Sequence, residues 1–407
     1  MSATFVGFGF GPLQAGLLLF EAVESGSFDR FVVAEVDQGL VDRVRSAGSE
    51  VAINIAGRTG IRTRRLRSIE VFNPRVAVDR DAIVSAVAEA GELGTAIPSV
   101  ELYASGGDAS VAATLARGAR PGRKRILYAA ENNNFAAEIL RKAIQECAPE
   151  EPFDDLQCLN TVIGKMSGVV TSPEEMNRLG VAPLVPGFDK CVLVEEFNRI
   201  LISRITLPGF NRGIRVFEEK DDLLPFEEAK LYGHNAVHAL LGYLARLRGY
   251  DAMSRIREDA KLMALGRRVF LQESGAALIS RHAGTRDSLF TEAGFAAYAE
   301  DLMERMVNPW LFDRVDRIIR DPVRKLGWED RFFGAMRLCL QAGIAPEGLA
   351  LGAAAAAVYA ISEGQGRGET VRAFLSRLWG GSAGEPARES CLQLVEQAAP
   401  RLQEWRK

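Results

Sequence analysis

The feature that most constrains this chain is the run TFVGFGFGPLQAG at residues 4–16, in which a β-rich segment passes directly into closely spaced glycines and then into a helical pattern. FVVAEV (31–36) and the first part of RKRILYAAENNN (123–134) are further strand-like runs that lie between helical stretches. RVAVDRDAIVSAVAEAGEL (75–93) indicates a strand that continues into a helix. Alternation of strands and helices is typical of a doubly wound parallel sheet with helices on both faces.

The pattern changes near residue 200. Long helical stretches then dominate, among them GYDAMSRIREDAKLMALGRRVFLQESGAAL (249–278). The uncharged run LALGAAAAAVYAI (349–361) is too short to span a bilayer and predicts a buried helix. Because 407 residues are too many for one typical domain, we predict an α/β protein with a Rossmann-like domain at residues 1–200 and a mostly α-helical domain at residues 201–407.

Composition and charge exclude several classes of protein. The formal net charge is −3, which gives no electrostatic reason to expect a nucleic acid or an anionic membrane as partner. The five cysteines are far apart without a C-x-x-C pair, and there are only three histidines, so we expect no metal site and a reduced, cytoplasmic setting. The N-terminus lacks the positively charged segment of a signal peptide. No heptad repeat is evident, and a monomer is the default expectation.

The glycine-rich turn fits a dinucleotide-binding motif in two registers, Gly7-x-Gly9 or Gly9-x-Gly11. We prefer the second, because it leaves a full strand before the turn and puts Pro12 near the first helical turn, where proline is tolerated. Gln14 then occupies the position of the usual third glycine. Backbone N–H groups and the helix N-terminus would meet a pyrophosphate there; a βα turn without a ligand is the alternative. The predicted cofactor contacts in this turn are Gly9, Phe10, Gly11, Pro12 and Leu13.

A carboxylate after the next strand supports the cofactor hypothesis. FVVAEVD (31–37) contains Glu35 at a suitable distance along the chain to accept hydrogen bonds from an adenosine ribose. A carboxylate at this position repels a 2′-phosphate, which favours NAD over NADP. The alternative is that Glu35 simply ends a strand.

The run KLYGHNAVHALLGYL (230–244) places a lysine, an asparagine and a histidine beside an apolar stripe. In a regular helix, Lys230, Asn235 and His238 would fall within one arc of roughly 140°. Alcohol oxidation needs a base for the hydroxyl proton and donors for the developing alkoxide. A lysine whose pKa is lowered by burial is a suitable base. A solvated lysine and a histidine that only caps or packs are the structural alternatives.

Three motifs resemble the polyol-specific long-chain dehydrogenases and reductases. KLYGHNAVH (230–238) matches that family's K-x4-N-x2-H signature, and the helix around it is similar to that of the mannitol-1-phosphate 5-dehydrogenases. NPWLFDRVDRIIRDPVRKL (308–326) resembles the family's N-P-x-L-x-D…R-I-x-R-D-P-x-R-K-L stretch. YAAENNNF (128–135) is similar to its acidic–Asn loop after a Rossmann strand. The lysine signature and the R-D-P-x-R-K-L stretch are the specific parts of the resemblance.

The resemblance implies an NAD-dependent, metal-independent polyol dehydrogenase with its site between the two domains. It implies that Lys230 is the general base and that His238 positions the reacting hydroxyl. Asn132 and Asn235 would hold the alkoxide oxygen.

Two cations match family positions near the substrate. Arg317 and Lys325 suit a phosphate or a chain of hydroxyls. The structural alternative is an ion pair between these residues and one of three nearby acids, Asp313, Asp316 or Asp321.

The substrate and some departures from the family pattern leave alternatives open. The chain length favours the sugar-phosphate branch, so we expect mannitol 1-phosphate and fructose 6-phosphate as the substrate pair. A related mannitol 2-dehydrogenase or hexuronate reductase is the first alternative. Ala15 stands where the family's glycine turn commonly has an arginine, and Gly164 and Lys165 replace the acid and the arginine of a V-D-R-I-like segment. A non-catalytic NAD-binding paralogue is therefore the second alternative.

Overall fold

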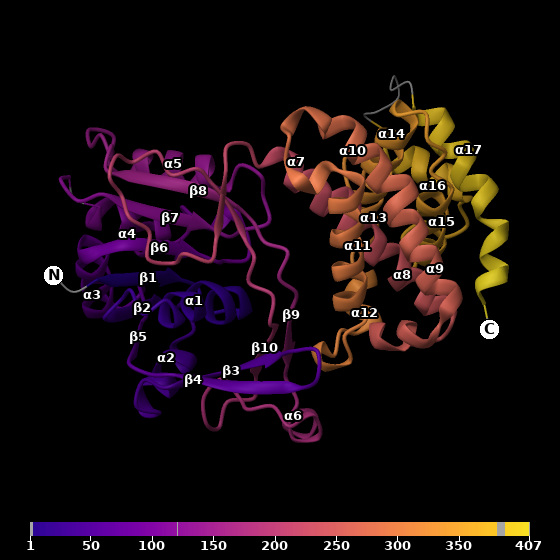
Figure 1. Cartoon of the computed structure of the whole chain (residues 1–407). Helices are drawn as coiled ribbons and strands as arrows, with labels where there is room; N and C mark the ends of the chain where they lie inside the picture. The colour runs from indigo at the N-terminus through magenta and orange to yellow at the C-terminus, as the bar shows by residue number, and fades with distance from the viewer. Residues whose placement is uncertain (1–2, 120, 381–386, 407) are drawn as a thin grey trace. The chain divides into compact units, whose positions relative to one another are not determined.

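The computed structural model describes residues 3–119, 121–380 and 387–406. Contacts divide the chain into two compact units, Met1–Leu223 and Leu224–Lys407 (Figure 1). The division falls later than the position near residue 200 that the change of pattern indicated. The reason is that two short strands, at Leu201–Ser203 and Glu218–Lys220, belong to the sheet of the first unit.

The first unit contains an eight-stranded sheet, in which the strands β1, β2 and β5 to β8 all run parallel to one another. Only β11 runs antiparallel to its neighbour β8. The order β5-β2-β1-β6-β7-β8 is that of a Rossmann fold, which confirms the predicted α/β class. From one edge to the other the strands are β12 (Glu218–Lys220), β11 (Leu201–Ser203), β8 (Leu156–Val162), β7 (Arg125–Ala129), β6 (Ala90–Thr95), β1 (Thr4–Phe8), β2 (Arg30–Ala34) and β5 (Ile69–Phe72).

Each face of this sheet has its own apolar core. Leucines, valines and alanines of α3, α4 and α5 pack on one face. Side chains of η1, α1 and α2 pack on the other face. The segment at 75–93 differs from the prediction: a turn and then α3 follow β5, and the final AGEL begins β6. The helical elements of this unit are η1 (Gln14–Leu19), α1 (Phe20–Glu24), α2 (Gln38–Ser46), α3 (Ala77–Glu89), η2 (Val100–Leu102), η3 (Gly107–Ala109), α4 (Val111–Gly118), α5 (Ala136–Cys147) and α6 (Pro173–Leu179).

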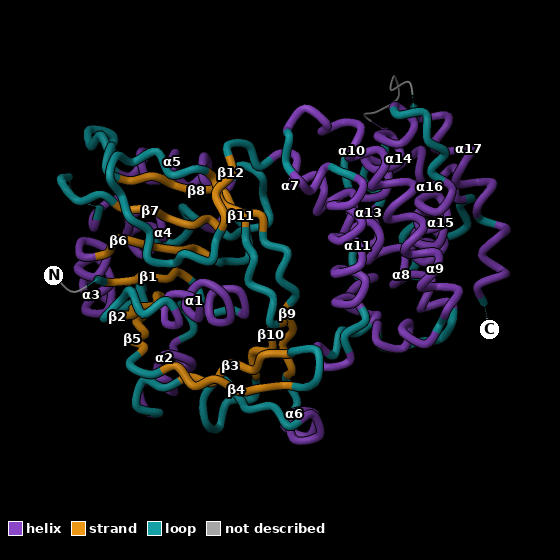
Figure 2. Tube along the Cα trace, viewed as in Figure 1, coloured by secondary structure: helices purple, strands orange, loops and turns teal. Residues whose placement is uncertain are grey.

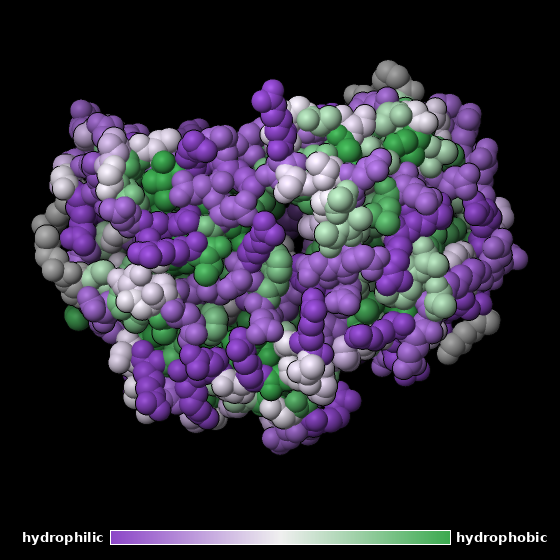
Figure 3. Space-filling model, in the orientation of Figure 1, coloured by the Kyte–Doolittle hydropathy of each residue, from purple (hydrophilic) through white to green (hydrophobic). Residues whose placement is uncertain are grey.

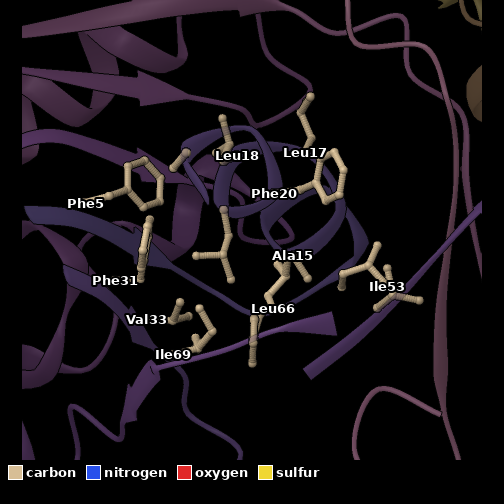
Figure 4. Close-up of a cluster of buried hydrophobic side chains, with 14 of the residues drawn as sticks. Phe5, Ala15, Leu17, Leu18, Phe20, Phe31, Val33, Ile53, Leu66 and Ile69 are labelled. Carbon is tan, nitrogen blue, oxygen red and sulfur yellow. The ribbon is translucent and has the colours of Figure 1, made fainter. Parts of the chain in front are cut away.

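A second sheet of four strands covers the helix that follows β1. Its order is β4-β3-β10-β9, and β3 pairs in parallel with β10, which lies far from it in sequence. Apolar side chains of β3 and β4 meet those of the first helix and of β1 and β2 in one cluster, in which Figure 4 labels Ala15, Ile53 and Leu66. The strands are β3 (Val51–Ala56), β4 (Ile61–Leu66), β9 (Ser167–Val170) and β10 (Cys191–Glu195).

The described part of the second unit is helical, as predicted, and Figure 2 shows only helices and loops there. The alanine-rich α15 is buried along most of its length and packs against α8. The elements are α7 (Leu224–Glu228), η4 (Ala229–Asn235), α8 (Ala236–Leu247), η5 (Met253–Glu258), α9 (Ala260–Arg268), η6 (Val269–Gly275), α10 (Ala276–His282), η7 (Ala283–Thr285), η8 (Ser288–Phe290), α11 (Glu292–Met306), η9 (Pro309–Leu311), α12 (Val315–Ile319), α13 (Pro322–Lys325), α14 (Arg331–Gln341), α15 (Glu347–Ser362), α16 (Val371–Leu378), α17 (Arg388–Ala398) and η11 (Pro400–Trp405).

Two long helices of this unit each contain a π-helical segment in the middle. One runs through α7, η4 and α8, and the other through α9, η6 and α10; η4 and η6 pack against each other. π-helical turns are rare and frequently occur at functional sites. No helix among the described residues is long and apolar enough to cross a membrane, and hydrophilic residues cover much of the face seen in Figure 3.

Candidate active site

The glycine turn follows β1 at the carboxyl edge of the large sheet. Gly9 has a φ of 84°, and a Cβ there would lie 2.8 Å from the carbonyl oxygen of Ala96, so only glycine fits this position. Gly11 is exposed, with open space where a Cβ would be, and Pro12 starts the helix as predicted. The backbone N–H groups of a first helical turn have no partner within the helix. The turn thus leaves room for an anion beside these donors.

Gln14 occupies the position of the third glycine of the usual motif, and Gly7 on the preceding strand makes room for its side chain. The side chain of Gln14 is fully buried, and its amide nitrogen and oxygen have no hydrogen-bond partner among the described residues. A Cβ at Gly7 would lie 2.0 Å from Nε2 of Gln14, so the glycine on the strand makes room for the glutamine on the helix. Ala15, where the family commonly has an arginine, lies in the apolar core.

Glu35 lies where a ribose-binding carboxylate is expected. The Gly9 N–H donates a 2.8 Å hydrogen bond to the carbonyl of Ala34, which places the turn beside the end of β2. Oε1 of Glu35 accepts a 2.8 Å hydrogen bond from the N–H of Asp37, and this fixes its direction. The predicted pyrophosphate and ribose contacts are therefore neighbours in the first unit.

Asn132 is exposed on the loop after β7, two strands from the glycine turn along the same carboxyl edge. The residue before it, Glu131, is buried and accepts hydrogen bonds from Oγ1 of Thr95 and the N–H of Ile97, both at 2.9 Å. It also accepts a hydrogen bond from the Tyr103 hydroxyl. Burial raises the pKa of Glu131, and these donors oppose that shift. Glu131 anchors the loop that carries Asn132. In the sequence, an acidic residue directly after an apolar strand indicates such an anchoring role.

The altered V-D-R-I-like segment has a buried lysine. Lys165 is only 7% exposed and lies in the electrostatic field of Glu21 on α1. Burial raises the pKa of Glu21, while Lys165 and a hydrogen bond to Asn198 oppose the shift. The replacement in this segment therefore brings a buried cation next to a buried acid within the first unit.

Lys230 lies in the π-helical segment η4, so the regular spacing assumed from the sequence is wrong for this part of the helix. The side chain is partly buried, and within the described part of the chain it makes no hydrogen bond or ion pair. Burial lowers the pKa of the amine to about 8; Glu227 opposes the shift and Arg331 reinforces it. The amine can therefore exchange its proton near physiological pH, as a general base requires. Asn235, at the end of η4, is partly buried.

Two histidines follow Lys230 on the same helix. The rings of His234 and His238 have centroids 5.8 Å apart. Burial, and then the charges of His238 and Arg305, lower the pKa of His234 well below its ordinary value, so its ring is neutral. Nε2 of His238 lies 3.3 Å from Oδ2 of Asp313, a residue that is almost fully buried. Asp313 was not predicted as the partner of His238, because nothing in the sequence links the two positions.

The structure separates the two predicted substrate cations. Arg317 forms the ion pair that was its structural alternative, with Nε at 2.8 Å from Oδ1 of Asp313. Lys325 is buried, and its Nζ donates to the carbonyl of Arg320. Burial, and then the charges of Arg331 and Arg324, lower the pKa of Lys325 to about 8.

Arg331, at the start of α14, is a cation that the sequence reasoning missed. Its Nε donates a 2.8 Å hydrogen bond to Asp330, but Arg324 also lies 3.4 Å from that carboxylate. Its charge acts on both Lys230 and Lys325. Arg331 and Arg324 thus share one carboxylate, and Asp321 and Asp330 oppose their effect on the pKa of Lys325. Among the described residues, no cluster of three or more His, Cys, Asp or Glu side chains is arranged to hold a metal ion.

Comparisons with known proteins show which proteins this chain is similar to. Residues 222–376 match the family described as the mannitol dehydrogenase C-terminal domain. The chain is 28% identical over 359 residues to a mannitol-1-phosphate 5-dehydrogenase of Caldanaerobacter subterraneus subsp. tengcongensis, an alignment that covers 88% of this chain and 86% of the relative.

Two solved structures share the fold. A D-sorbitol dehydrogenase in substrate-free form has a TM-score of 0.78 at 14% identity, with 99% of this chain and 94% of that chain covered. The mannitol 2-dehydrogenase of Pseudomonas fluorescens, in a ternary complex with NAD and D-mannitol, has a TM-score of 0.73 at 15% identity, with 99% and 92% covered. Both likenesses support a Rossmann-type fold followed by a helical second unit.

Proposed function

We propose that the chain, whose residues 222–376 match the mannitol dehydrogenase C-terminal domain family, is an NAD-dependent oxidoreductase of sugar alcohols. We propose further that it interconverts mannitol 1-phosphate and fructose 6-phosphate. The observation that carries the proposal is the amine of Lys230, which is desolvated, unpaired within the described residues and brought to a pKa of about 8. A lysine in that state is suited to take a proton from an alcohol.

The first unit supplies features that fit NAD. Gly11 leaves open space beside the start of the first helix, where backbone donors suit a pyrophosphate. Glu35 lies at the end of the neighbouring strand β2, where its carboxylate accepts from ribose hydroxyls and repels a 2′-phosphate. NAD, when bound, supplies the acceptor for a hydride from the carbinol carbon.

Residues of this chain would handle the proton and the oxygen. In oxidation, the neutral amine of Lys230 removes the hydroxyl proton as the hydride leaves. Asn132 and Asn235 donate hydrogen bonds to the oxygen as negative charge develops on it. His238 orients the substrate so that this hydroxyl faces Lys230. In reduction, the ammonium form of Lys230 returns the proton.

The charge near Lys325 supports a phosphorylated substrate. Arg317 is neutralised by Asp313 and offers less free charge than expected. Lys325 and Arg331 lie near each other, and Arg331 shares its carboxylate partner Asp330 with Arg324. A phosphate dianion would relieve the repulsion between the two cations and raise the pKa of Lys325. The relative named mannitol-1-phosphate 5-dehydrogenase supports the same substrate class.

Specific observations also favour two alternatives to this function. The structural likeness to a mannitol 2-dehydrogenase favours an unphosphorylated polyol, and a hexuronate would also satisfy the cations. The replacement of the family's arginine by Ala15, which is buried in the core, favours a protein that binds NAD without turnover.

The test is a substrate panel combined with one variant. Purified protein is mixed with NADH and with ketoses, ketose phosphates and hexuronates, and loss of NADH is followed by absorbance. Activity confined to ketose phosphates supports the proposal; activity on free ketoses or hexuronates selects the first alternative. Lys230→Ala should abolish turnover while NADH fluorescence still reports binding, and Lys142→Ala, an exposed lysine of α5, should behave as wild type. Near-normal turnover by Lys230→Ala would show that Lys230 is not the base.

A further inference from the structure

Asp313 is held from several sides. Its side chain is 2% exposed, and Oδ1 accepts hydrogen bonds from Nε of Arg317 at 2.8 Å and contacts a terminal nitrogen of the same guanidinium at 2.7 Å. Its backbone carbonyl accepts a 2.9 Å hydrogen bond from the N–H of Met253, which ties the loop to η5. The carboxylate therefore has little freedom to move.

The second oxygen of Asp313 faces His238. Oδ2 lies 3.3 Å from Nε2 of the ring, a distance that allows an ion pair although the alignment is not yet that of a hydrogen bond. Neither atom has another partner among the described residues, and both are completely buried. Burial alone would raise the pKa of Asp313, but His238 and Arg317 outweigh it and lower the pKa. Asp313 is therefore an ionised acceptor directed at one ring nitrogen.

We propose that Asp313, oriented by Arg317, is a positioning residue that fixes the ring of His238 with the proton on Nε2 and leaves Nδ1 to accept a hydrogen bond from a substrate hydroxyl next to the one that Lys230 deprotonates. The role of Nδ1 toward a substrate hydroxyl rests on the proposed function, but the contact between Asp313 and His238 does not depend on that function. Arg317 thereby acts through Asp313 and not as the substrate contact that the sequence predicted.

The opposite tautomer is disfavoured by simple electrostatics. With the proton on Nδ1, the lone pair of Nε2 would face the carboxylate across 3.3 Å, and Oδ2 would be a buried charge without a donor. The neighbouring His234 does not replace that donor, because Oδ2 accepts no hydrogen bond from it. The ionised carboxylate therefore selects Nε2–H.

An asparagine at position 313 inverts this preference, which gives a sharp test. The amide of Asp313→Asn can donate to Nε2 and so favours the proton on Nδ1, the exchange of tautomer known for the aspartate of serine-protease triads. Because the chain has only three histidines, 15N-histidine labelling gives three ring systems, and the His238 signals are assigned by their loss in His238→Gln. The wild type should show Nε2–H for His238, and Asp313→Asn should show Nδ1–H.

Activity supplies the second measurement. Asp313→Asn should lower kcat about tenfold or more while NADH binding is unchanged, because only the hydroxyl is mispositioned. Arg317→Lys, which keeps a cation on Asp313, should retain the Nε2–H tautomer and most of kcat. Asp316→Asn is the matched control, because Asp316 is exposed and pairs with Arg246 at the surface.

Each outcome decides one part of the proposal. A wild-type ring with the proton on Nδ1 overturns it without any variant, and so does an Asp313→Asn protein whose His238 signals and kcat match the wild type. A rise in KM for Arg317→Lys with unchanged ring signals and kcat would assign Arg317 to the substrate. If the wild type reduces no ketose, the proposed function fails, and the ring signals alone still test the contact.

Discussion

The carboxylate of Glu273 accepts a 2.8 Å hydrogen bond from the backbone N–H of Gly348, at the start of α15. It accepts a second hydrogen bond, at 2.9 Å, from the N–H of Leu349. It also forms an ion pair with Arg268 at 3.0 Å. A side chain of the π-helical segment η6 thus caps the buried helix that packs against α8. Burial raises the pKa of Glu273, and these three donors oppose the shift.

Removing this cap should destabilise the second unit. Glu273→Ala leaves two buried N–H donors without an acceptor, and we expect a loss of about 2–4 kcal/mol in the free energy of unfolding. Urea denaturation measures it. Glu300→Ala is the matched control, since its ion pair with Arg267 is exposed, and should cost less than about 1 kcal/mol. Equal losses for the two variants would contradict the capping role.

The contact between Gly7 and Gln14 predicts a rescue. A methyl group at Gly7 overlaps the buried amide of Gln14, so Gly7→Ala should lower the free energy of unfolding by about 1–3 kcal/mol. Adding Gln14→Ala to the Gly7→Ala variant should recover most of the lost free energy of unfolding. Gly91→Ala, in the neighbouring strand β6 where the space is open, is the control. Thermal unfolding that shows no recovery in the double variant would refute the pairing.

The glycine turn separates cofactor binding from folding. Gly11→Ala meets open space and should leave thermal stability nearly unchanged, yet weaken NADH binding about tenfold or more, because the methyl group occupies the approach of the pyrophosphate. Fluorescence titration measures the affinity. Gly9→Ala, at a φ of 84°, should instead destabilise the fold. Unchanged NADH affinity in Gly11→Ala would place the cofactor elsewhere.

The lowered pKa of Lys230 predicts opposite pH profiles for the two directions. Oxidation needs the neutral amine, so kcat/KM should fall as the pH drops below about 8 and level off above it. Reduction needs the ammonium form and should decline above the same pH. Initial rates in both directions measure this. An oxidation rate that stays flat across the two pH units centred on 8 would exclude Lys230 as the titrating base.

Lys325 and Arg331 should decide the preference for phosphate. Lys325→Met and Arg331→Met should each reduce kcat/KM for the ketose phosphate by about 10- to 100-fold, with a much smaller effect on the free ketose. Arg324→Met is the control, because that side chain is exposed and lies 3.4 Å from Asp330. An equal loss of kcat/KM on both substrates would argue that these cations stabilise the fold or tune the pKa of Lys230 and do not bind the phosphate.

The large sheet and the motifs at its edge could be predicted because their signals are local. The glycine turn needs a positive φ at Gly9, and the strand before it is apolar throughout. The small sheet could not be predicted. The run IRTRRL of β4 has four exposed residues in succession and no apolar alternation, and β3 pairs with β10 across more than 130 residues.

The candidate site shows the same division. The sequence gives the spacing of Lys230, Asn235 and His238 along the chain. Their directions around the helix could not be derived from a regular α-helix, because η4 is π-helical and its turns are wider. Arg317 and Lys325 look equivalent as two cations of one motif. Their surroundings differ, since one meets a buried carboxylate and the other a carbonyl and further cations.

The sequence by itself determined the alternation of strands and helices in the first half and the helical second half, and it indicated the candidate residues for the proposed chemistry. Hydrophobic periodicity, glycine conformation and motif spacing carry this information because they act over a few residues. Only the tertiary structure decided which of those residues are charged, neutral or already paired. The pKa of Lys230 and the partner of His238 depend on burial and on groups such as Arg331 and Asp313, which approach from distant parts of the chain. Desolvation and Coulomb energies follow distance in space and not separation in sequence.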